Sequence, residues 1–266
     1  MMFRRYLVLL LMFFVPIVSA TDVRCKFKSE LDKTSINELE QQAKEGNPRS
    51  QFLMYYAYRE GFYGEKDLEK ARYWLLVASD KDPDAQIFVA KNLESRKLYS
   101  EAYKWYGKAA ELQNSYAYYM MGVYRSYEQY GMIDLRKSVQ LFEKAVSLGG
   151  VAGAYTQIGI AYVYGAGVSE DVSKGLEILL HGALKGDPEA YRLLSKLYAE
   201  GEIVTKDMSL SEEYQKKYEV LLSTRKAAEC DFERVSSAKA AANQGLNALA
   251  TLAGTVRSAS RPLAKR

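Results

Sequence analysis

Apolar and small residues recur along this chain with a helical period that is nested inside a longer repeat. In the best-preserved copy, Ala154, Ile158, Gly159 and Tyr162 lie one, three or four residues apart. This spacing places their side chains along one face of an α-helix, whereas a strand would alternate every second residue. The register returns at intervals of 32 to 37 residues, and its five starts are Gly46, Lys81, Gln113, Gly150 and Gly186. A period of that length predicts a stacked array of structural repeats.

Each copy contains a second helical stretch that keeps the register of the first. In the first copy this stretch carries Ala71, Trp74 and Ala78, again at steps of three and four residues. Each repeat is therefore predicted to be a pair of antiparallel helices, which we call helix A and helix B. Small residues at a helix crossing let the two axes approach closely, so the pattern favours tight packing within each pair.

The fourth copy shows the complete motif, and its residues carry a family resemblance. They are Ala154, Ile158, Gly159, Tyr162, Gly165, Gly167, Val168, Asp171 and Gly186. With them the chain resembles the Sel-like repeat family, relatives of the tetratricopeptide repeats, over about residues 35–222. Repeat two departs most, because its loop between helices A and B shortens to about residues 94–100 and lacks the Gly and Asp. The resemblance implies an all-α fold: a right-handed α-solenoid of five helix pairs, capped at both ends, that binds proteins.

The first 20 residues have the layout of a secretory signal peptide. Arg4 and Arg5 precede an apolar run over residues 6–18, and Val18-Ser19-Ala20 offers small residues for cleavage after Ala20. The alternative is a retained membrane anchor, but the run is shorter than the roughly 20 residues that a spanning helix needs. We therefore expect a periplasmic protein, or alternatively a secreted one, with no stable membrane insertion after cleavage.

The rest of the chain is predicted to form four further zones. Residues 21–45 hold a leader and an N-terminal capping helix, for which Thr34 or Ser35 is the N-cap and Glu38 completes a capping box. Residues 46–222 hold the five repeats, residues 223–256 a C-terminal helix, and residues 257–266 a basic tail. The C-terminal helix has three interpretations: a cap on repeat five, an arm that docks into a partner, or a helix that lies on a membrane surface.

Two cysteines remain after signal cleavage, and they bracket the repeats. Cys25 lies before the array and Cys230 after it. An even number of cysteines in an oxidising compartment is compatible with a disulfide. The ends of a solenoid grow apart, however, and bridged Cα atoms lie within about 7 Å. A Cys25–Cys230 bridge and a pair of free or intermolecular thiols therefore both stay open.

Charge and residue chemistry argue against nucleic-acid binding and catalysis. The formal net charge is +4, far from the basic stripe of a nucleic-acid-binding protein. The single histidine, His181, stands in no cluster with metal-ligand spacing, and no nucleophile–base motif is present. Gly165-Ala166-Gly167 lies between two predicted helices and is better explained as the turn of a repeat than as a phosphate-binding loop. We expect no enzyme activity, no cofactor and no metal.

The aromatic content points instead to contacts with a partner. Tyrosine accounts for 22 of the 266 residues, and many of these lie outside the packing positions of the repeats. We count from the Ala at the start of each helix A, which in repeat one is Ser50. Two and six residues further on, the first four repeats are mostly apolar. The resemblance places this face of the helices in the concave groove. The predicted partner contacts are Phe52, Tyr56, Ile87, Tyr119, Val123 and Ile160. The alternative is that these side chains are buried between repeats.

The leading hypothesis is a secreted or periplasmic protein that grips another protein in its concave groove. Proteins similar to this one include immunity-type inhibitors of toxic effectors, such as lipases delivered by type VI secretion. A cell-envelope regulator or assembly scaffold is the alternative within the same class. A glycan-active enzyme and a host-directed effector are the alternatives from other classes.

Overall fold

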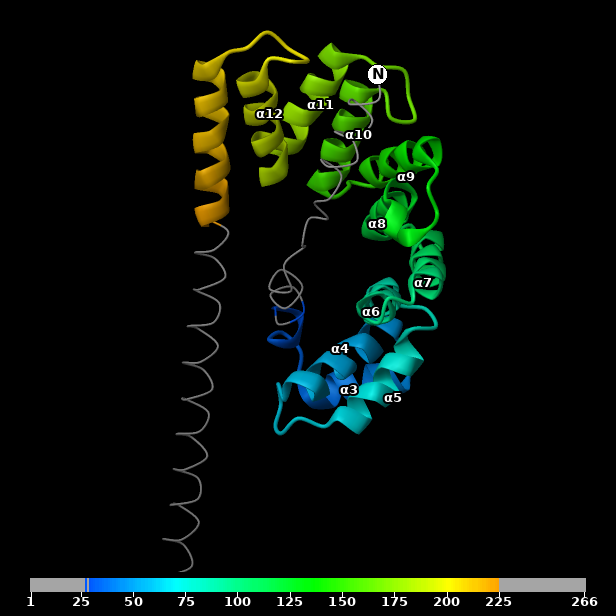
Figure 1. The fold of residues 1–266 in the computed structure, drawn as a ribbon. Helices are drawn as coiled ribbons and strands as arrows, with labels where there is room; N and C mark the ends of the chain where they lie inside the picture. Colours follow the sequence, from blue (N-terminus) through cyan, green and yellow to red (C-terminus); the bar gives the residue numbers. More distant parts are fainter. Residues whose placement is uncertain (1–26, 28, 225–266) are drawn as a thin grey trace, which may run out of the picture. The chain divides into compact units, whose positions relative to one another are not determined.

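The computed structural model describes residue 27 and residues 29–224. The chain divides into two compact units, Met1–Glu219 and Val220–Arg266, and the second unit is described only at residues 220–224, which are helical. A further helix occupies residues 208–219 of the first unit. The other helices of the first unit follow one another along the chain (Figure 1): α3 (Ile36–Lys44), α4 (Pro48–Glu60), α5 (Leu68–Ala78), α6 (Pro83–Ser95), α7 (Tyr99–Glu111), α8 (Ser115–Ser126), η1 (Glu128–Tyr130), α9 (Leu135–Ser147), α10 (Ala152–Tyr164), α11 (Val172–Leu184) and α12 (Pro188–Glu200).

The described residues form an all-α solenoid built from stacked helix pairs. Within each repeat, helix A packs most closely on its own helix B, as α4 does on α5, α6 on α7, α8 on α9 and α10 on α11. Helix B then packs on helix A of the next repeat, and α3 packs on α4 at the start of the array. In repeat five, Tyr214 brings the helix from residue 208 against α12, because its ring lies 6.1 Å from Tyr191 and 6.0 Å from Tyr198.

The helix starts are set by polar caps that were visible in the sequence. The side chain of Ser35 accepts a hydrogen bond from the amide of Glu38, and Asn47 and Asp82 cap α4 and α6 in the same way. Pro follows Asn47, Asp82 and Asp187 at the first helical position, where its missing N–H leaves no hydrogen bond unmade. The predicted starts of these helices are therefore confirmed.

An aspartate closes the loop between helices A and B in four of the five repeats. In repeat four the Asp171 amide donates to the carbonyl of Tyr162 at 2.9 Å, while the Asp171 side chain caps α11. The equivalent bonds join Asp67 to Tyr58, Asp134 to Arg125 and Asp207 to Tyr198. Repeat two has no such aspartate, and its loop turns through Lys97 with a φ of 60° instead. The departure of repeat two that the sequence predicted is therefore present.

Several of the sequence predictions lie outside the described residues. They are the signal peptide at residues 1–20, the Cys25–Cys230 pair, the C-terminal helix beyond residue 224, and the basic tail at residues 257–266.

Candidate partner-binding site

The six residues predicted to contact a partner lie in the interior of the first unit. All of them are buried, from Val123 with no exposed surface to Ile87 with 8%. The set is Phe52, Tyr56, Ile87, Tyr119, Val123 and Ile160. The sequence predicted that these positions of the A helices face a concave groove, whereas here they have little solvent exposure. Their role in partner binding stays a prediction, and any such role requires that something first uncovers them.

Aromatic neighbours account for much of this burial. Phe27, from the segment before the repeats, places its ring 5.1 Å from Phe52 and 5.4 Å from Tyr56. Tyr119 lies 5.7 Å from Phe142 on α9. The A helices are thus covered on several sides, because each one packs against its own helix B, the preceding helix and further aromatic side chains.

The tyrosines of repeats two and three form a cluster around Glu94. The hydroxyls of Tyr106 and Tyr124 donate to its two carboxylate oxygens at 3.2 and 3.3 Å. Tyr130 stacks on Tyr124 at 4.1 Å and meets Tyr99 edge-on at 5.0 Å. Burial raises the pKa of Glu94, and the tyrosine hydrogen bonds oppose that rise. This cluster occupies the space beside the short loop of repeat two, so part of the high tyrosine content is structural.

The turn between α5 and α6 differs from the other turns that lead from one helix pair to the next. The turns into α4, α8, α10 and α12 each contain a left-handed residue: Gly46, Gln113, Gly149 and Gly186. Each of these four turns also makes a hydrogen bond that spans five residues, such as Asp187 N–H to the Gly182 carbonyl at 3.1 Å. The α5–α6 turn, residues 79–82, has neither feature.

One missing residue explains this difference. Ala78 and Ala85 lie seven residues apart, whereas the corresponding pairs in the next three repeats lie eight or nine apart. The shorter turn is closed by a four-residue hydrogen bond from the Asp82 amide to the Ala78 carbonyl at 2.8 Å. As a result, α5 and α6 pack less closely than α7 and α8, α9 and α10, or α11 and α12.

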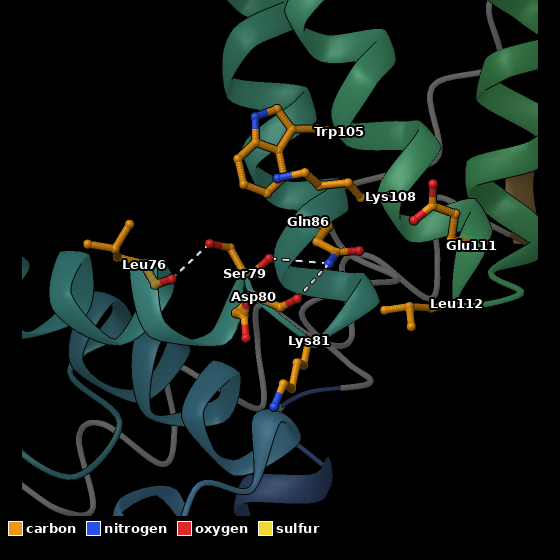
Figure 2. A pocket seen from close by; sticks show the side chains of 9 residues that line it. All are labelled: Leu76, Ser79, Asp80, Lys81, Gln86, Trp105, Lys108, Glu111 and Leu112. Carbon is orange, nitrogen blue, oxygen red and sulfur yellow. Dashed lines mark hydrogen bonds between the residues drawn. The ribbon is translucent and has the colours of Figure 1, made fainter.

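A pocket of about 430 Å³ opens beside this turn, and we call it the notch (Figure 2). It lies between the end of α5, the start of α6 and the last turns of α7. Its lining residues are Leu76, Ser79, Asp80, Lys81, Gln86, Trp105, Lys108, Glu111 and Leu112. Sequence reasoning missed the notch, although the short spacing between Ala78 and Ala85 was a signal that could have located it.

The lining of the notch combines apolar walls with balanced charge. The Lys108 ammonium lies 3.8 Å from the centre of the Trp105 ring, a cation–π contact. The Gln86 amide nitrogen donates to the carbonyls of Ser79 and Asp80 at 3.2 and 3.3 Å, as Figure 2 shows, while its buried oxygen accepts no hydrogen bond from the described residues. The lining contains two lysines and two acids, so the notch does not favour a strongly charged ligand of either sign.

The outer side of α5 adds apolar surface next to the notch. Leu76 is 74% exposed and Leu68 66% exposed, and Tyr73 is exposed on the same helix. At 100° per residue these three positions fall within about 140° of the helix circumference. Leu112 at the end of α7 is also exposed, on the far side of the notch. Single exposed apolar residues are ordinary, but a group beside a concave pocket is typical of an interaction site.

Asp82 caps α6 at the edge of this turn, and we expect it to make stability depend on pH. Burial raises its pKa from an ordinary value near 4 to about 6, while hydrogen bonds from backbone amides and the Arg49 charge oppose the rise. Between pH 4 and pH 6 the folded chain then holds a proton that the unfolded chain has released, so stability falls as pH rises through this window. Asp82→Asn keeps the capping oxygen and removes the charge. As pH rises from 4 to 7, we expect the free energy of unfolding of this variant to increase by about 1–2 kcal/mol relative to that of the wild type, measured by urea unfolding. If the free energies of the two proteins change in parallel with pH, the raised pKa is contradicted.

Comparison with known proteins assigns the fold to a family. The Sel1 repeat model matches five consecutive segments, which are residues 48–83, 83–114, 115–150, 152–187 and 188–217. This chain belongs to the Sel1 repeat family. Sel1 repeats form protein-interaction modules, and the matched segments coincide with the helix pairs described above.

Two solved structures with TM-scores above 0.5 give the same architecture. A Sel1 repeat protein from Oxalobacter formigenes shares 26% identity over 69% of this chain and 77% of that one, with a TM-score of 0.60. The protective antigen c5321 of uropathogenic Escherichia coli shares 21% identity over 74% of this chain, with a TM-score of 0.52, and this chain spans half of its length. The immunity protein PA5088 of Pseudomonas aeruginosa shares 18% identity over 79% of this chain and 84% of that one, with a TM-score of 0.49. No curated protein matches this sequence.

The described residues hold neither a metal-binding cluster nor a membrane-spanning helix. No group of three or more His, Cys, Asp or Glu side chains in this part of the chain is arranged to hold a metal ion. None of the helices described here is both long and apolar enough to cross a membrane. The ring of His181 lies 4.7 Å from the ring of Tyr155.

Proposed function

We propose that this protein is a periplasmic binding protein that holds a partner protein and acts by occupying it, without chemistry of its own. The observation that carries the proposal is the exposed apolar surface of α5 beside the notch, on a scaffold of five protein-interaction repeats. The proposed contacts are Leu68, Tyr73, Leu76, Trp105 and Leu112. Trp105 is half-buried in the notch and Tyr73 is exposed on α5, and these are residue types enriched at binding hot spots, while the exposed leucines add apolar surface around them.

Within this class we propose an immunity-type inhibitor of a toxic effector, with a cell-envelope scaffold as the second candidate. The sequence supports an exported protein, since residues 1–20 have the layout of a signal peptide. The two candidates differ in their partners. An inhibitor binds one effector tightly and in fixed stoichiometry, whereas a scaffold binds several envelope proteins more weakly.

The experiment is an affinity capture with tagged full-length protein, exported and processed in its own cell, from envelope and secreted fractions. One stoichiometric partner, such as a lipase or another toxin, supports the inhibitor. Several envelope proteins support the scaffold. Capture of no protein from either fraction contradicts the proposed function.

We expect Leu76→Glu to weaken binding of the captured partner at least tenfold, because it places a carboxylate on the apolar wall of the notch. Leu184→Glu is the matched control, since Leu184 is 71% exposed on the distant helix α11 and its replacement should change affinity less than threefold. Both positions are exposed, so the free energy of unfolding should change by less than about 0.5 kcal/mol. Equal effects of the two substitutions on affinity, measured by calorimetry, would remove the notch from the binding site.

A further inference from the structure

A short segment before the first repeat covers part of α4 and is held there like a bound peptide. We call residue 27 and residues 29–34 the leader segment. The Phe27 ring is 3% exposed and meets Phe52 edge-on at 5.1 Å, with an interplanar angle of 87°. It also lies 5.4 Å from the ring of Tyr56. Phe52 and Tyr56 are two of the residues that the sequence analysis predicted as partner contacts, and the chain itself supplies the aromatic side chain that covers them.

A salt bridge between Arg49 and Glu30, which we call the clamp, holds the leader segment about one helical turn after Phe27. Arg49, at the start of α4, donates to both carboxylate oxygens of Glu30, at 2.8 and 2.5 Å. This fork-shaped arrangement is the strong and directional form of an arginine–carboxylate pair. The same guanidinium lies 4.8 Å from the centre of the Phe27 ring, so one arginine contacts both anchor residues of the segment.

A tyrosine from the loop of repeat one fastens the end of the segment. The Tyr63 hydroxyl lies 2.9 Å from the carbonyl oxygen of Leu31 and 2.8 Å from that of Thr34. These carbonyls belong to backbone at the end of a short helical segment, so the contact does not depend on which side chains the segment carries. Arg49, Phe52, Tyr56 and Tyr63 together form what we call the receptor surface.

The receptor surface and its occupant belong to different parts of the chain. The receptor residues lie within the first Sel1 repeat, which starts at residue 48, whereas the leader segment precedes all five repeats. The Arg49 and Glu30 side chains are each about one-third exposed, so water reaches the clamp and a competing carboxylate can exchange with Glu30. The segment presents an aromatic side chain and, three residues later, a carboxylate, which fall on one face of a helix.

We propose that the receptor surface binds a helical segment of the partner protein with an aromatic residue and, three residues later, a carboxylate, and that the leader segment is an internal occupant which the partner displaces. This inference rests on the proposed function and names the chemistry of the partner segment. Because the leader segment is tethered, its effective concentration is high, and it lowers the apparent affinity for any competing segment. Displacement also explains how buried Phe52 and Tyr56 can become contacts with a partner.

The test uses the full mature chain and a fluorescein-labelled peptide with the sequence of residues 26–34, followed by fluorescence anisotropy. The Phe27→Ala/Glu30→Gln double variant weakens the internal occupant and leaves the receptor surface intact. We expect it to bind the peptide at least tenfold more tightly than the wild type. In this variant background, Tyr63→Phe or Arg49→Gln should lower the affinity again by at least fivefold, and a peptide with Ala in place of its Phe should not bind.

Equal affinity of the wild type and the double variant for the peptide overturns the inference, as does equal binding of the Ala-substituted peptide. Circular dichroism checks that each variant is folded, and Tyr63→Phe retains the ring, so a folding defect in Arg49→Gln does not remove the test. If affinity capture finds a partner but the peptide does not bind the double variant, this inference fails and the proposed function stands. If the peptide binds and capture finds no partner, the receptor surface accepts a displaceable segment, but the proposed function fails.

Discussion

Replacing Gly167 with alanine is expected to lower the free energy of unfolding by about 3 kcal/mol or more. Gly167 lies in the loop between α10 and α11 with a φ of +81°, a conformation that costs alanine about 1–2 kcal/mol. A methyl group there would also collide with the backbone at the start of α9: it would lie 2.7 Å from the Arg136 amide nitrogen and closer still to the Leu135 carbonyl. Backbone atoms cannot move away as the end of a flexible side chain can. The loop of repeat four would therefore lose its close contact with α9 of repeat three.

Gly149→Ala is the matched control for this prediction. Gly149 has a φ of +84°, but no atom lies within 4 Å of the methyl group that alanine would add. We expect it to cost only the conformational strain, about 1–2 kcal/mol. Urea unfolding followed by circular dichroism compares the two variants. Equal losses would mean that the loop of repeat four does not contact α9 as closely as the structure shows.

Gly175→Ala is expected to lower the free energy of unfolding by about 2–3 kcal/mol, because the added methyl group forces α10 and α11 apart where they cross. Gly175 on α11 faces Gly159 on α10, and an added methyl group at Gly175 would lie 2.6 Å from a Val163 methyl, 2.8 Å from the Val163 amide nitrogen and 2.9 Å from the Gly159 carbonyl. Two of these three atoms belong to the backbone, so relief requires that the helices separate. The small residues at this crossing therefore permit the close approach that the sequence pattern predicted.

Gly107→Ala is the control for a helical glycine without a close neighbour. Gly107 lies within α7, and no atom approaches within 4 Å of its added methyl group. Alanine restricts the unfolded chain and favours the helix, so we expect a gain of about 0.5–1 kcal/mol. The same substitution thus stabilises at one position and destabilises at the other. A loss at Gly107, or a gain at Gly175, measured by urea unfolding, would contradict the packing described here.

Both proposed contact surfaces are connected through Arg49. Its guanidinium binds Glu30 of the leader segment, and it also donates to Asp84 at 2.6 Å and lies 3.9 Å from Asp82. Asp82 and Asp84 lie at the start of α6, next to the turn that shapes the notch. A partner carboxylate that replaces Glu30 therefore binds an arginine that also contacts this turn. The residues of both surfaces come from repeats one and two, together with the leader segment.

An apolar pattern in the sequence does not by itself separate a binding groove from a buried core. Phe52 and Tyr119 lie at apolar positions away from the packing stripe, and both arrangements produce this pattern. The structure buries them, because Phe27 and Phe142 come from segments 25 and 23 residues away in sequence and no local period reports such contacts.

The sequence by itself determined the repeat period, the helix pairs, the polar caps and the missing aspartate of repeat two. These features depend on residues close together in the chain, where helical spacing and capping chemistry act directly. Only the tertiary structure decided which apolar residues are exposed, that Phe27 and Glu30 occupy α4, and that a turn shorter by one residue opens the notch between α5 and α7. Exposure and cavities depend on how neighbouring repeats meet, and that geometry results from all the side chains at each junction together.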